Sequence, residues 1–187
     1  VELVRSEDGR TWKSVSVIHK DHLPNETELC FLPGGELLAL VRREEPPHHP
    51  LLACAQPPYN GAWKKVECDG FLQGPLLEHL GDGRFLVVGR SPQALGPQEH
   101  PGRSPKVTRL FRLDPETGHL DPGAALESGN DTSYAGFVRL PSDAQKGAHG
   151  AANSLLSYYS GHGYDNGTFR GKDEAQRCAI FVARTTV

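Results

Sequence analysis

The stretch LPGGELLALVR, from Leu32 to Arg42, returns 48 positions later as LGDGRFLVVGR, from Leu80 to Arg90. In both copies a polar, glycine-containing turn leads into an apolar run that ends at an arginine. A third copy begins at Leu140 as LPSDAQKGAHGAANSLLSYY, with an insertion before the apolar run returns at Leu155. The chain therefore contains a repeat with a period near 48 residues.

Each period holds two successive hairpins, because further strand-like runs lie between the copies. PLLACAQ and AWKKVEC flank PYNG, and KVTRLFRL precedes DPETG. Two hairpins per repeat predict the four-stranded blade of a β-propeller, whose sheets bury their faces against their neighbours. A β-sandwich is the alternative, but it gives no reason for the repeat. We therefore predict an all-β fold, a single domain over residues 1–187 that forms an incomplete ring of about three to four propeller blades.

The composition excludes several classes of partner. Of the 187 residues, 37% are hydrophobic, which is typical of a globular chain. The formal net charge of -3, without a dense cluster of lysine and arginine, argues against a nucleic-acid partner. No apolar run approaches the length of a membrane-spanning helix, so we expect no membrane span. The cysteines have neither CxxC spacing nor a histidine at zinc-ligand spacing, and we expect no metal and no cofactor.

A polar turn near the N-terminus, SEDGRTW, separates VELVR from WKSVSVI. Both flanking stretches alternate apolar and polar residues with the period of half-buried strands, so the turn predicts a hairpin. Asp8 is expected to accept hydrogen bonds from backbone amides, Gly9 to supply unusual backbone angles, and Trp12 to pack beside the corner. We predict that Ser6 and these three residues have structural roles only.

The repeat also aligns polar residues that lie far apart in the sequence. Six positions before each copy, the equivalent residues are Glu26, Gly74 and Tyr134. At the far end of the second strand of each copy, the equivalent residues are Arg42, Arg90 and Tyr159. Because the inner strands of neighbouring blades meet at the central channel, we expect these residues to line one concave site.

Several of these segments resemble the sialidase superfamily. SEDGRTW is similar to its Asp-box, or BNR repeat, and NETELCFLPGGELLALVR matches its Asn-Glu pair followed after a hairpin by an arginine. GNDTSYAG, SYYSGH and CAIFVAR are similar to the later strands of uncharacterised sialidase-like proteins. The resemblance implies a six-bladed propeller, of which this chain corresponds to the C-terminal part. The family's first carboxylate-binding arginine and its acid/base aspartate belong to early blades, and no segment here matches either.

The resemblance implies a glycoside hydrolase that removes sialic acid or a related acidic sugar from glycans. It assigns Tyr134 as the nucleophile, Glu26 as the base that activates it, and Arg42 as the group that binds the substrate carboxylate. A neutral phenol suits such a substrate, because the carboxylate on its anomeric carbon would repel an anionic nucleophile. The phenol needs a base within reach, and the planar arginine fork donates two parallel charge-assisted hydrogen bonds.

The residues predicted in addition to bind substrate are Arg90, Asp131, Tyr159 and His162. The resemblance favours a secreted or periplasmic protein whose partner is a glycan. An incomplete propeller exposes unpaired backbone and apolar blade faces, so self-association through its open edge is expected. The alternative function is a non-catalytic glycan-binding or scaffold propeller, because such a protein keeps the blades without needing the pair of Glu26 and Tyr134.

Overall fold

The computed structural model describes residues 1–94, 105–129, 131–140, 153–161 and 179–186. These residues form strands and turns, and they contain no helix long and apolar enough to cross a membrane. The strands are β1 (Glu2–Arg5), β2 (Lys13–Val17), β3 (Pro24–Phe31), β4 (Leu37–Arg43), β5 (Leu51–Ala55), β6 (Lys64–Glu67), β7 (Gln73–Gly81), β8 (Arg84–Pro92), β9 (Lys106–Leu113), β10 (Leu120–Leu126), β11 (Thr132–Arg139), β12 (Asn153–Ser160) and β13 (Ala179–Thr186).

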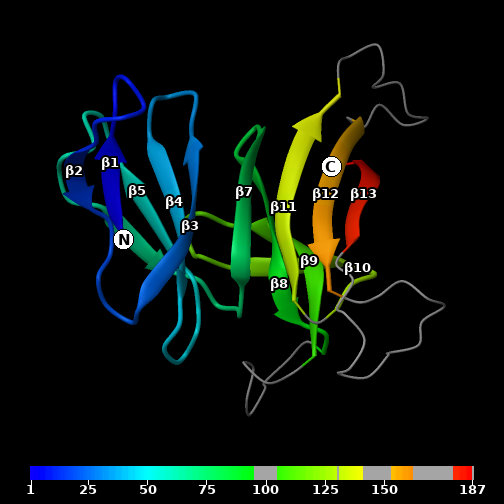
Figure 1. Cartoon of the computed structure of the whole chain (residues 1–187). Helices are drawn as coiled ribbons and strands as arrows, with labels where there is room; N and C mark the ends of the chain where they lie inside the picture. The colour runs from blue at the N-terminus through cyan, green and yellow to red at the C-terminus, as the bar shows by residue number, and fades with distance from the viewer. Residues whose placement is uncertain (95–104, 130, 141–152, 162–178, 187) are drawn as a thin grey trace.

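The strands form four antiparallel sheets, and each sheet is built from strands that are consecutive in the chain. The sheets contain β1–β2, β3–β6, β7–β10 and β11–β13. Figure 1 shows them following one another in chain order without closing a ring. The predicted all-β architecture of an incomplete propeller is therefore confirmed, with two four-stranded blades flanked by a two-stranded and a three-stranded sheet.

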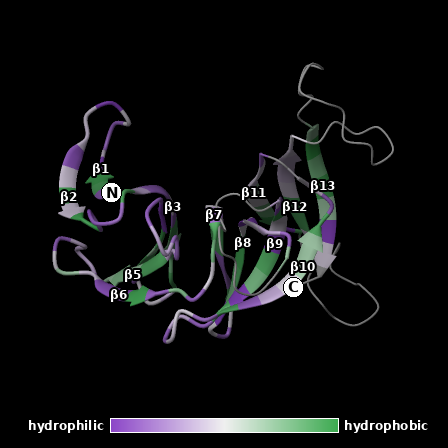
Figure 2. Cartoon of the chain, turned by 90° about the horizontal axis from the view of Figure 1, so that it is seen from below, coloured by the Kyte–Doolittle hydropathy of each residue, from purple (hydrophilic) through white to green (hydrophobic). Residues whose placement is uncertain are grey.

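The core lies between consecutive sheets, so the central strands are buried on both faces. On β4, Leu40 packs into the cluster shared with β7–β10, whereas its neighbour Val41 packs into the cluster shared with β1–β2. On β8, Val87 faces the sheet β3–β6 and Val88 faces the sheet β11–β13. Successive side chains of a strand point to opposite faces, which explains why the repeat ends in near-continuous apolar runs. Figure 2 shows these hydrophobic strands in the interior of the fan of sheets.

The turns of the repeated stretch close through glycine. In the first copy the Leu32 amide donates to the Glu36 carbonyl at 2.9 Å, and Gly35 has a φ of 94°. In the second copy Gly83 has a φ of 69°. A positive φ is costly for residues that carry a Cβ atom, so the glycines in these turns are required by the backbone.

The N-terminal turn forms as predicted, apart from Trp12. The Asp8 carboxylate accepts from the amides of Thr11 at 2.7 Å and Arg10 at 2.8 Å, and these bonds lower the pKa of Asp8 to about 2. Gly9 has a φ of 70°, and its amide donates to Ser6 Oγ at 2.8 Å. Trp12 remains 59% exposed, and its packing beside the corner stays a prediction. The hydrogen bonds inside the turn close it.

Apolar side chains remain exposed on the first complete sheet and on the last sheet. Leu29 and Phe31 are exposed on β3, and Val138, Ile180 and Val182 are exposed on β11 and β13. Large exposed apolar patches commonly mark interaction surfaces. Self-association through these faces stays a prediction.

The inner strand of each of the last three sheets contains a bulge at its beginning. The pairing register shifts between Pro24 and Thr27 on β3, between Gln73 and Leu76 on β7, and between Ser133 and Gly136 on β11. Bulges bend a strand and re-aim its side chains, and they often lie beside functional sites. These three bulges contain the repeat-equivalent residues Glu26, Gly74 and Tyr134.

Candidate functional site

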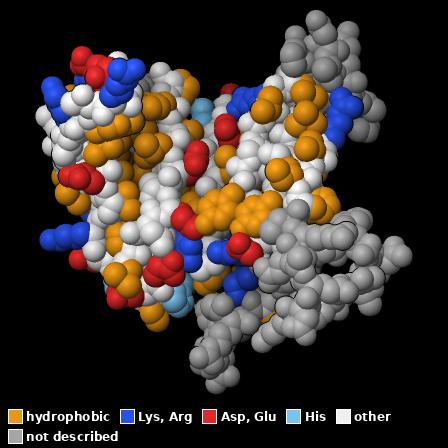
Figure 3. Space-filling model, viewed as in Figure 1, with side chains coloured by type: hydrophobic (Ala, Val, Ile, Leu, Met, Phe, Trp, Pro, Cys, Tyr) orange, Lys and Arg blue, Asp and Glu red, His pale blue; other side chains and the backbone are white. Residues whose placement is uncertain are grey.

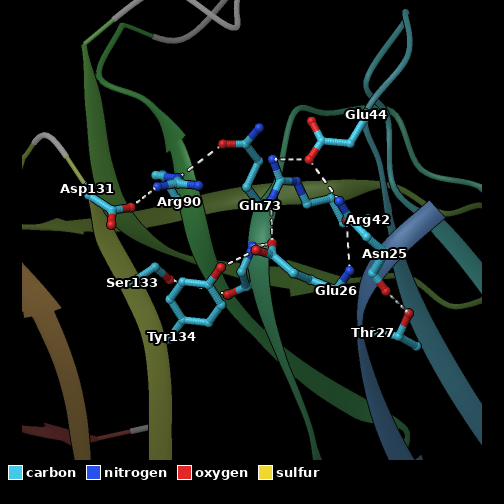
Figure 4. A network of polar contacts seen from close by, with 11 residues as sticks. Asn25, Glu26, Thr27, Arg42, Glu44, Gln73, Arg90, Asp131, Ser133 and Tyr134 are labelled. Atoms are coloured by element: carbon cyan, nitrogen blue, oxygen red, sulfur yellow. Dashed lines mark hydrogen bonds and ion pairs between the residues drawn. The ribbon is translucent and has the colours of Figure 1, made fainter. Parts of the chain in front are cut away.

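The repeat-equivalent residues of the inner strands meet at one point. The Tyr134 hydroxyl on β11 donates to Glu26 Oε1 on β3, and the Gly74 amide on β7 donates to Glu26 Oε2 at 2.9 Å. The Ser133 hydroxyl donates to the Gly74 carbonyl at 3.3 Å. Figure 4 shows Glu26 and Tyr134 pointing toward each other from different strands. Three sheets thus contribute to one site.

Glu26 is held as a carboxylate by its hydrogen-bond donors. Burial by itself raises its pKa, but the hydrogen bonds from Tyr134, Arg42 and the Gly74 amide outweigh burial, and the pKa is lowered. Arg42 Nη1 lies 2.7 Å from Glu26 Oε2. Hydrogen bonds to the charged form of an acid favour that form. Glu26 is therefore ionised at neutral pH and accepts a hydrogen bond from the Tyr134 hydroxyl.

Tyr134 is a neutral phenol at an exposed position. The hydrogen bond to Glu26 and, after it, burial raise the pKa of the Tyr134 hydroxyl. The residue is 53% exposed, although its backbone and its neighbours fix its place. Tyr134 has a φ of 42° and Ser133 a φ of 98°, values that residues with a Cβ atom rarely adopt. Strained backbone of this kind concentrates at functional sites.

Arg42 is occupied by two carboxylates. Its Nη1 contacts Glu26, and its Nη2 lies 2.8 Å from Glu44 Oε1, while its side chain is only 10% exposed. Its neighbour Arg43 points to the other face of β4, where it donates to the His49 carbonyl at 2.6 Å and to Glu67 at 2.7 Å. Arg42 therefore belongs to the site, and Arg43 is a structural residue.

Arg90 lies on the other side of the site, with Asp131 and Gln73. Its Nε donates to Gln73 Oε1 at 3.0 Å, and its Nη1 forms an ion pair with Asp131 Oδ1. Tyr159 stacks on Tyr134 with ring centroids 5.8 Å apart and an interplanar angle of 12°. Burial and a hydrogen bond to Asp131 raise the pKa of Tyr159. The residues predicted at the second position of the repeat thus surround the Tyr134 and Glu26 pair.

The cluster lies where the sheets β3–β6, β7–β10 and β11–β13 meet. Figure 3 shows acidic and basic side chains on this face of the molecule beside a small group of hydrophobic ones. His162, which was predicted to bind substrate, lies outside the described residues. Another arginine, Arg109, is buried on β9, where it donates to Ser91, Gly123 and Gln93 and takes no part in the cluster's described contacts.

Sequence reasoning placed Gly74 at the site without giving it a role, and it missed two other residues of the cluster. Gly74 occupies a repeat-equivalent position but has no side chain, and its backbone amide is the functional group. Gln73 and Glu44 lie next to predicted positions, one residue before Gly74 and two residues after Arg42. A search for polar residues flanking the repeat-equivalent positions would have found Gln73 and Glu44.

Gly74→Ala is expected to weaken the hydrogen bond from the residue 74 amide to Glu26 and to lower the melting temperature. Gly74 has a φ of 55°, and an added Cβ atom would lie 3.6 Å from the Tyr134 ring. The available space accepts a methyl group, but the backbone conformation is strained for alanine by about 1 to 2 kcal/mol. Gly74→Asn should be milder, because asparagine tolerates a positive φ better. The check is the melting temperature, and an alanine variant as stable as the parent would contradict this role.

Two carboxyl groups away from the cluster, Glu28 on β3 and Glu78 on β7, make the free energy of unfolding depend on pH. Burial raises the pKa of both, and the charge of Glu78 raises that of Glu28 further. The folded state then binds more protons than the unfolded state. The contribution of this pair to the free energy of unfolding is complete below the unfolded-state pKa near 4.5. It is lost as the pH rises through the raised pKa values of the folded state.

Glu78→Gln is therefore expected to raise the free energy of unfolding at pH 7 by on the order of 1 kcal/mol or less, and to bring no gain below pH 4.5. Urea unfolding at both pH values is the measurement. Glu127→Gln, at an exposed position, is the matched control and should change neither value. A gain that is equal at both pH values would contradict the carboxyl pair as its cause.

No family model matches the chain, and no curated protein matches it. Among solved structures, the chain is similar to GH43B of the Bacteroides ovatus xyloglucan PUL, with a TM-score of 0.58 and 14% identity. The match covers 97% of this chain and 33% of that chain, so this chain spans about a third of that structure's length. At this identity the likeness shows the fold alone, which is a β-propeller.

This comparison corrects the resemblance to the sialidase superfamily. The fold neighbour belongs to GH43, a family of five-bladed propellers, and not to the sialidases. The SEDGRTW turn closes through hydrogen bonds among its own residues, as the Asp8 contacts show. Such a turn can form wherever a hairpin needs it, so it does not identify the family. The assignment of the chain to the sialidases, with its Asp-box and six-bladed ring, is therefore wrong.

Proposed function

We propose that this propeller is a glycoside hydrolase in which Tyr134 is the nucleophile and Glu26 the base that activates it. The observation that carries the proposal is the hydrogen bond from the exposed Tyr134 phenol to the ionised Glu26 carboxylate, where three sheets meet. A nucleophile in hydrogen-bond contact with a base that is itself oriented by a third group is the general pattern of covalent catalysis. Here Arg42 and the Gly74 amide orient the base. The GH43 fold neighbour adds support for a sugar substrate.

In the first step the Tyr134 oxygen attacks the anomeric carbon while Glu26 takes the phenol proton. A bond forms between the tyrosine oxygen and the sugar, and the bond from the sugar to the leaving oxygen breaks. The leaving oxygen takes a proton from solvent. In the second step water attacks the same carbon, Glu26 returns its proton to the tyrosine oxygen as that bond breaks, and the water proton passes to solvent. Two displacements at one carbon retain its configuration.

The substrate that suits a phenol nucleophile is a sugar with a carboxylate on its anomeric carbon. A carboxylate nucleophile would be repelled by that charge, whereas a neutral phenol is not. The site also contains two guanidinium groups, Arg42 and Arg90, on either side of the pair. Guanidinium groups recognise carboxylates through paired charge-assisted hydrogen bonds.

The test compares the nitrophenyl glycosides of a sialic acid and of xylose as substrates, with proton NMR to identify the first product anomer. We expect turnover of the acidic glycoside with retained configuration, and a glycosylated tyrosine in the mass spectrum of the quenched protein. Turnover of the xyloside alone, or inversion, would contradict the proposal.

A non-catalytic glycan-binding propeller is the second candidate. The stacked rings of Tyr134 and Tyr159 favour it, because exposed aromatic rings give sugars an apolar surface to pack against. Binding of a glycan without turnover of either glycoside would favour this candidate.

A further inference from the structure

Two fully buried threonines join the sheet β7–β10 to the sheet β11–β13. Thr108 on β9 and Thr132 on β11 are both 0% exposed, and their hydroxyl oxygens lie 2.8 Å apart. The Thr132 hydroxyl donates to the Tyr159 carbonyl on β12 at 2.6 Å. A hydroxyl carries a single proton, so Thr108 is the donor in the bond between the two threonines. The threonine pair, Thr108 and Thr132, thus forms a directed chain of hydrogen bonds from β9 through β11 to β12.

The threonine pair lies next to residues of the candidate site in both sheets. Thr108 is the register partner of Arg90, and residues directly opposite each other on antiparallel strands project to the same face of the sheet. Thr132 precedes Tyr134 by two residues on β11. The ring of Tyr159, whose carbonyl accepts from Thr132, stacks on the Tyr134 ring. Thr132 is therefore linked both to the strand that carries Tyr134 and to the residue on which its ring stacks.

The backbone at Tyr134 needs support from its surroundings. Ser133 and Tyr134 have φ values of 98° and 42°, and they lie at the bulge between Ser133 and Gly136. Such conformations cost free energy and persist only where the surrounding structure holds them. Ser133 contributes one long hydrogen bond, at 3.3 Å, to the Gly74 carbonyl. Thr132 directly precedes the two strained residues, so its buried hydrogen bonds fix the point at which the strained backbone begins.

A second polar link between the same two sheets is weaker. The ion pair between Arg90 and Asp131 has a partner that is 68% exposed, and exposed ion pairs contribute little to stability. A buried polar group that loses its partner costs more than the loss of such a pair, because it cannot turn to water. Of these two links, the threonine pair therefore holds β11 against β9 more strongly.

We propose that Thr132 and Thr108 are positioning residues that hold Tyr134 in hydrogen-bond contact with Glu26. Among the described contacts, neither threonine side chain touches Glu26 or the Tyr134 hydroxyl, so the pair acts through the backbone of β11. The inference rests on the proposed function for its kinetic consequence, whereas the placement of the phenol is measured without turnover.

The experiment measures the pKa of Glu26 by carbon NMR of the whole chain labelled at glutamate Cδ, with Glu26→Gln to assign the signal. Burial raises the pKa of Glu26, but hydrogen bonds, with that from Tyr134 first, lower it below its ordinary value. Tyr134→Phe removes this donor and gives the full rise in pKa for comparison. Thr132→Val keeps the shape of the side chain and removes its hydroxyl. We expect Thr132→Val to reproduce most of that rise, because the displaced phenol no longer donates to Glu26.

The same variant should lower kcat on an aryl glycoside of an acidic sugar by about ten- to a hundredfold, the usual effect of a misplaced reacting group. KM should change by less than about threefold, because no residue that binds substrate is altered. Thr132→Ser keeps the hydroxyl and should restore both kcat and the lowered pKa of Glu26.

Ser91→Ala is the matched control. Ser91 is 1% exposed, and its hydroxyl donates to the Pro92 carbonyl and accepts from Arg109, both in its own sheet. Its loss removes a buried hydroxyl without touching the contact between the two sheets. The variant should therefore leave the pKa of Glu26 and kcat unchanged, even where its melting temperature falls.

A double variant separates positioning from stability. In Thr132→Val alone, the Thr108 hydroxyl loses the acceptor to which it donates in the parent. Thr108→Val combined with Thr132→Val replaces both partners with apolar groups of similar shape, so the melting temperature should recover toward that of the parent. The pKa of Glu26 should stay raised, because the Tyr159 carbonyl still lacks its donor. If Thr132→Val fails to fold, the double variant supplies the measurement.

An unchanged pKa of Glu26 in folded Thr132→Val or in the double variant would overturn the proposal, as would a Thr132→Ser variant that behaves like Thr132→Val. The outcomes also separate this inference from the proposed function. A raised pKa of Glu26 in Thr132→Val of a protein that turns over no glycoside would support the threonine pair and contradict the hydrolase. Turnover with a Glu26 pKa that is insensitive to Thr132→Val would support the hydrolase and overturn this inference.

Discussion

Tyr134→Phe is expected to lower kcat on an aryl glycoside of an acidic sugar by about three orders of magnitude or more, with an unchanged fold. The substitution removes one hydroxyl, which is the atom proposed to attack the anomeric carbon. The ring stays in place, because its stack on Tyr159 does not involve the hydroxyl. Steady-state kinetics measure the loss, and the melting temperature shows whether the protein folds.

Tyr159→Phe is the matched control for this prediction. It removes the same atom from the ring that stacks on Tyr134, but its hydroxyl contacts Asp131 and not Glu26. We expect a loss of about tenfold or less, because the nucleophile and its base are untouched. Equal losses in the two variants would show that the Tyr134 hydroxyl matters no more than the Tyr159 hydroxyl, and would contradict the assignment of Tyr134 as the nucleophile.

Glu26→Gln is expected to lower kcat by about two to four orders of magnitude, the usual range for a general base. The neutral amide no longer accepts a proton from the phenol, although it occupies nearly the same volume. The pH dependence should change as well. In the parent, the lowered pKa of Glu26 keeps the base ionised, so activity falls only as the pH drops through that lowered value. In the variant this fall of activity at low pH should disappear.

Glu44→Gln separates the role of the base from the role of the charge. Glu44 contacts the same guanidinium as Glu26, at 2.8 Å from Arg42 Nη2, but the described contacts link it to Asn25 and Arg42 and not to Tyr134. The loss of the Glu44 charge should reduce kcat by less than about tenfold and should preserve the fall of activity at low pH. If Glu44→Gln lost as much activity as Glu26→Gln, the carboxylates would act only by holding Arg42.

The fold could be predicted because its signal is repeated along the chain. The apolar run that contains Leu40 and Val41 returns as the run that contains Val87 and Val88, and only a sheet buried on both faces needs such runs. The exposure of Trp12 could not be predicted, because a turn that closes through its own hydrogen bonds does not require an aromatic contact. The family could not be predicted from that turn for the same reason.

The candidate site was predictable to the extent that the repeat controls it. Glu26 and Tyr134 are 108 positions apart, yet their equivalent places on inner strands put them in contact. The partners of the two arginines were not predictable, because they depend on side-chain directions at bulges. Gln73 and Glu44 lie beside the aligned positions and not at them. Gly74 acts through its backbone amide, and a comparison of side-chain types cannot detect such a role.

The bulges at the start of β3, β7 and β11 place a group from each of three sheets in one site. The geometry of the site therefore depends on how these sheets pack against one another. Ladders of backbone hydrogen bonds hold each sheet, whereas side-chain packing joins one sheet to the next. A sub-global opening that parts two sheets would therefore separate Tyr134 from Glu26 while every ladder survived. In rising urea, activity should then vanish at concentrations where the far-ultraviolet circular dichroism and the slow amide hydrogen exchange of the central strands are still those of the native protein.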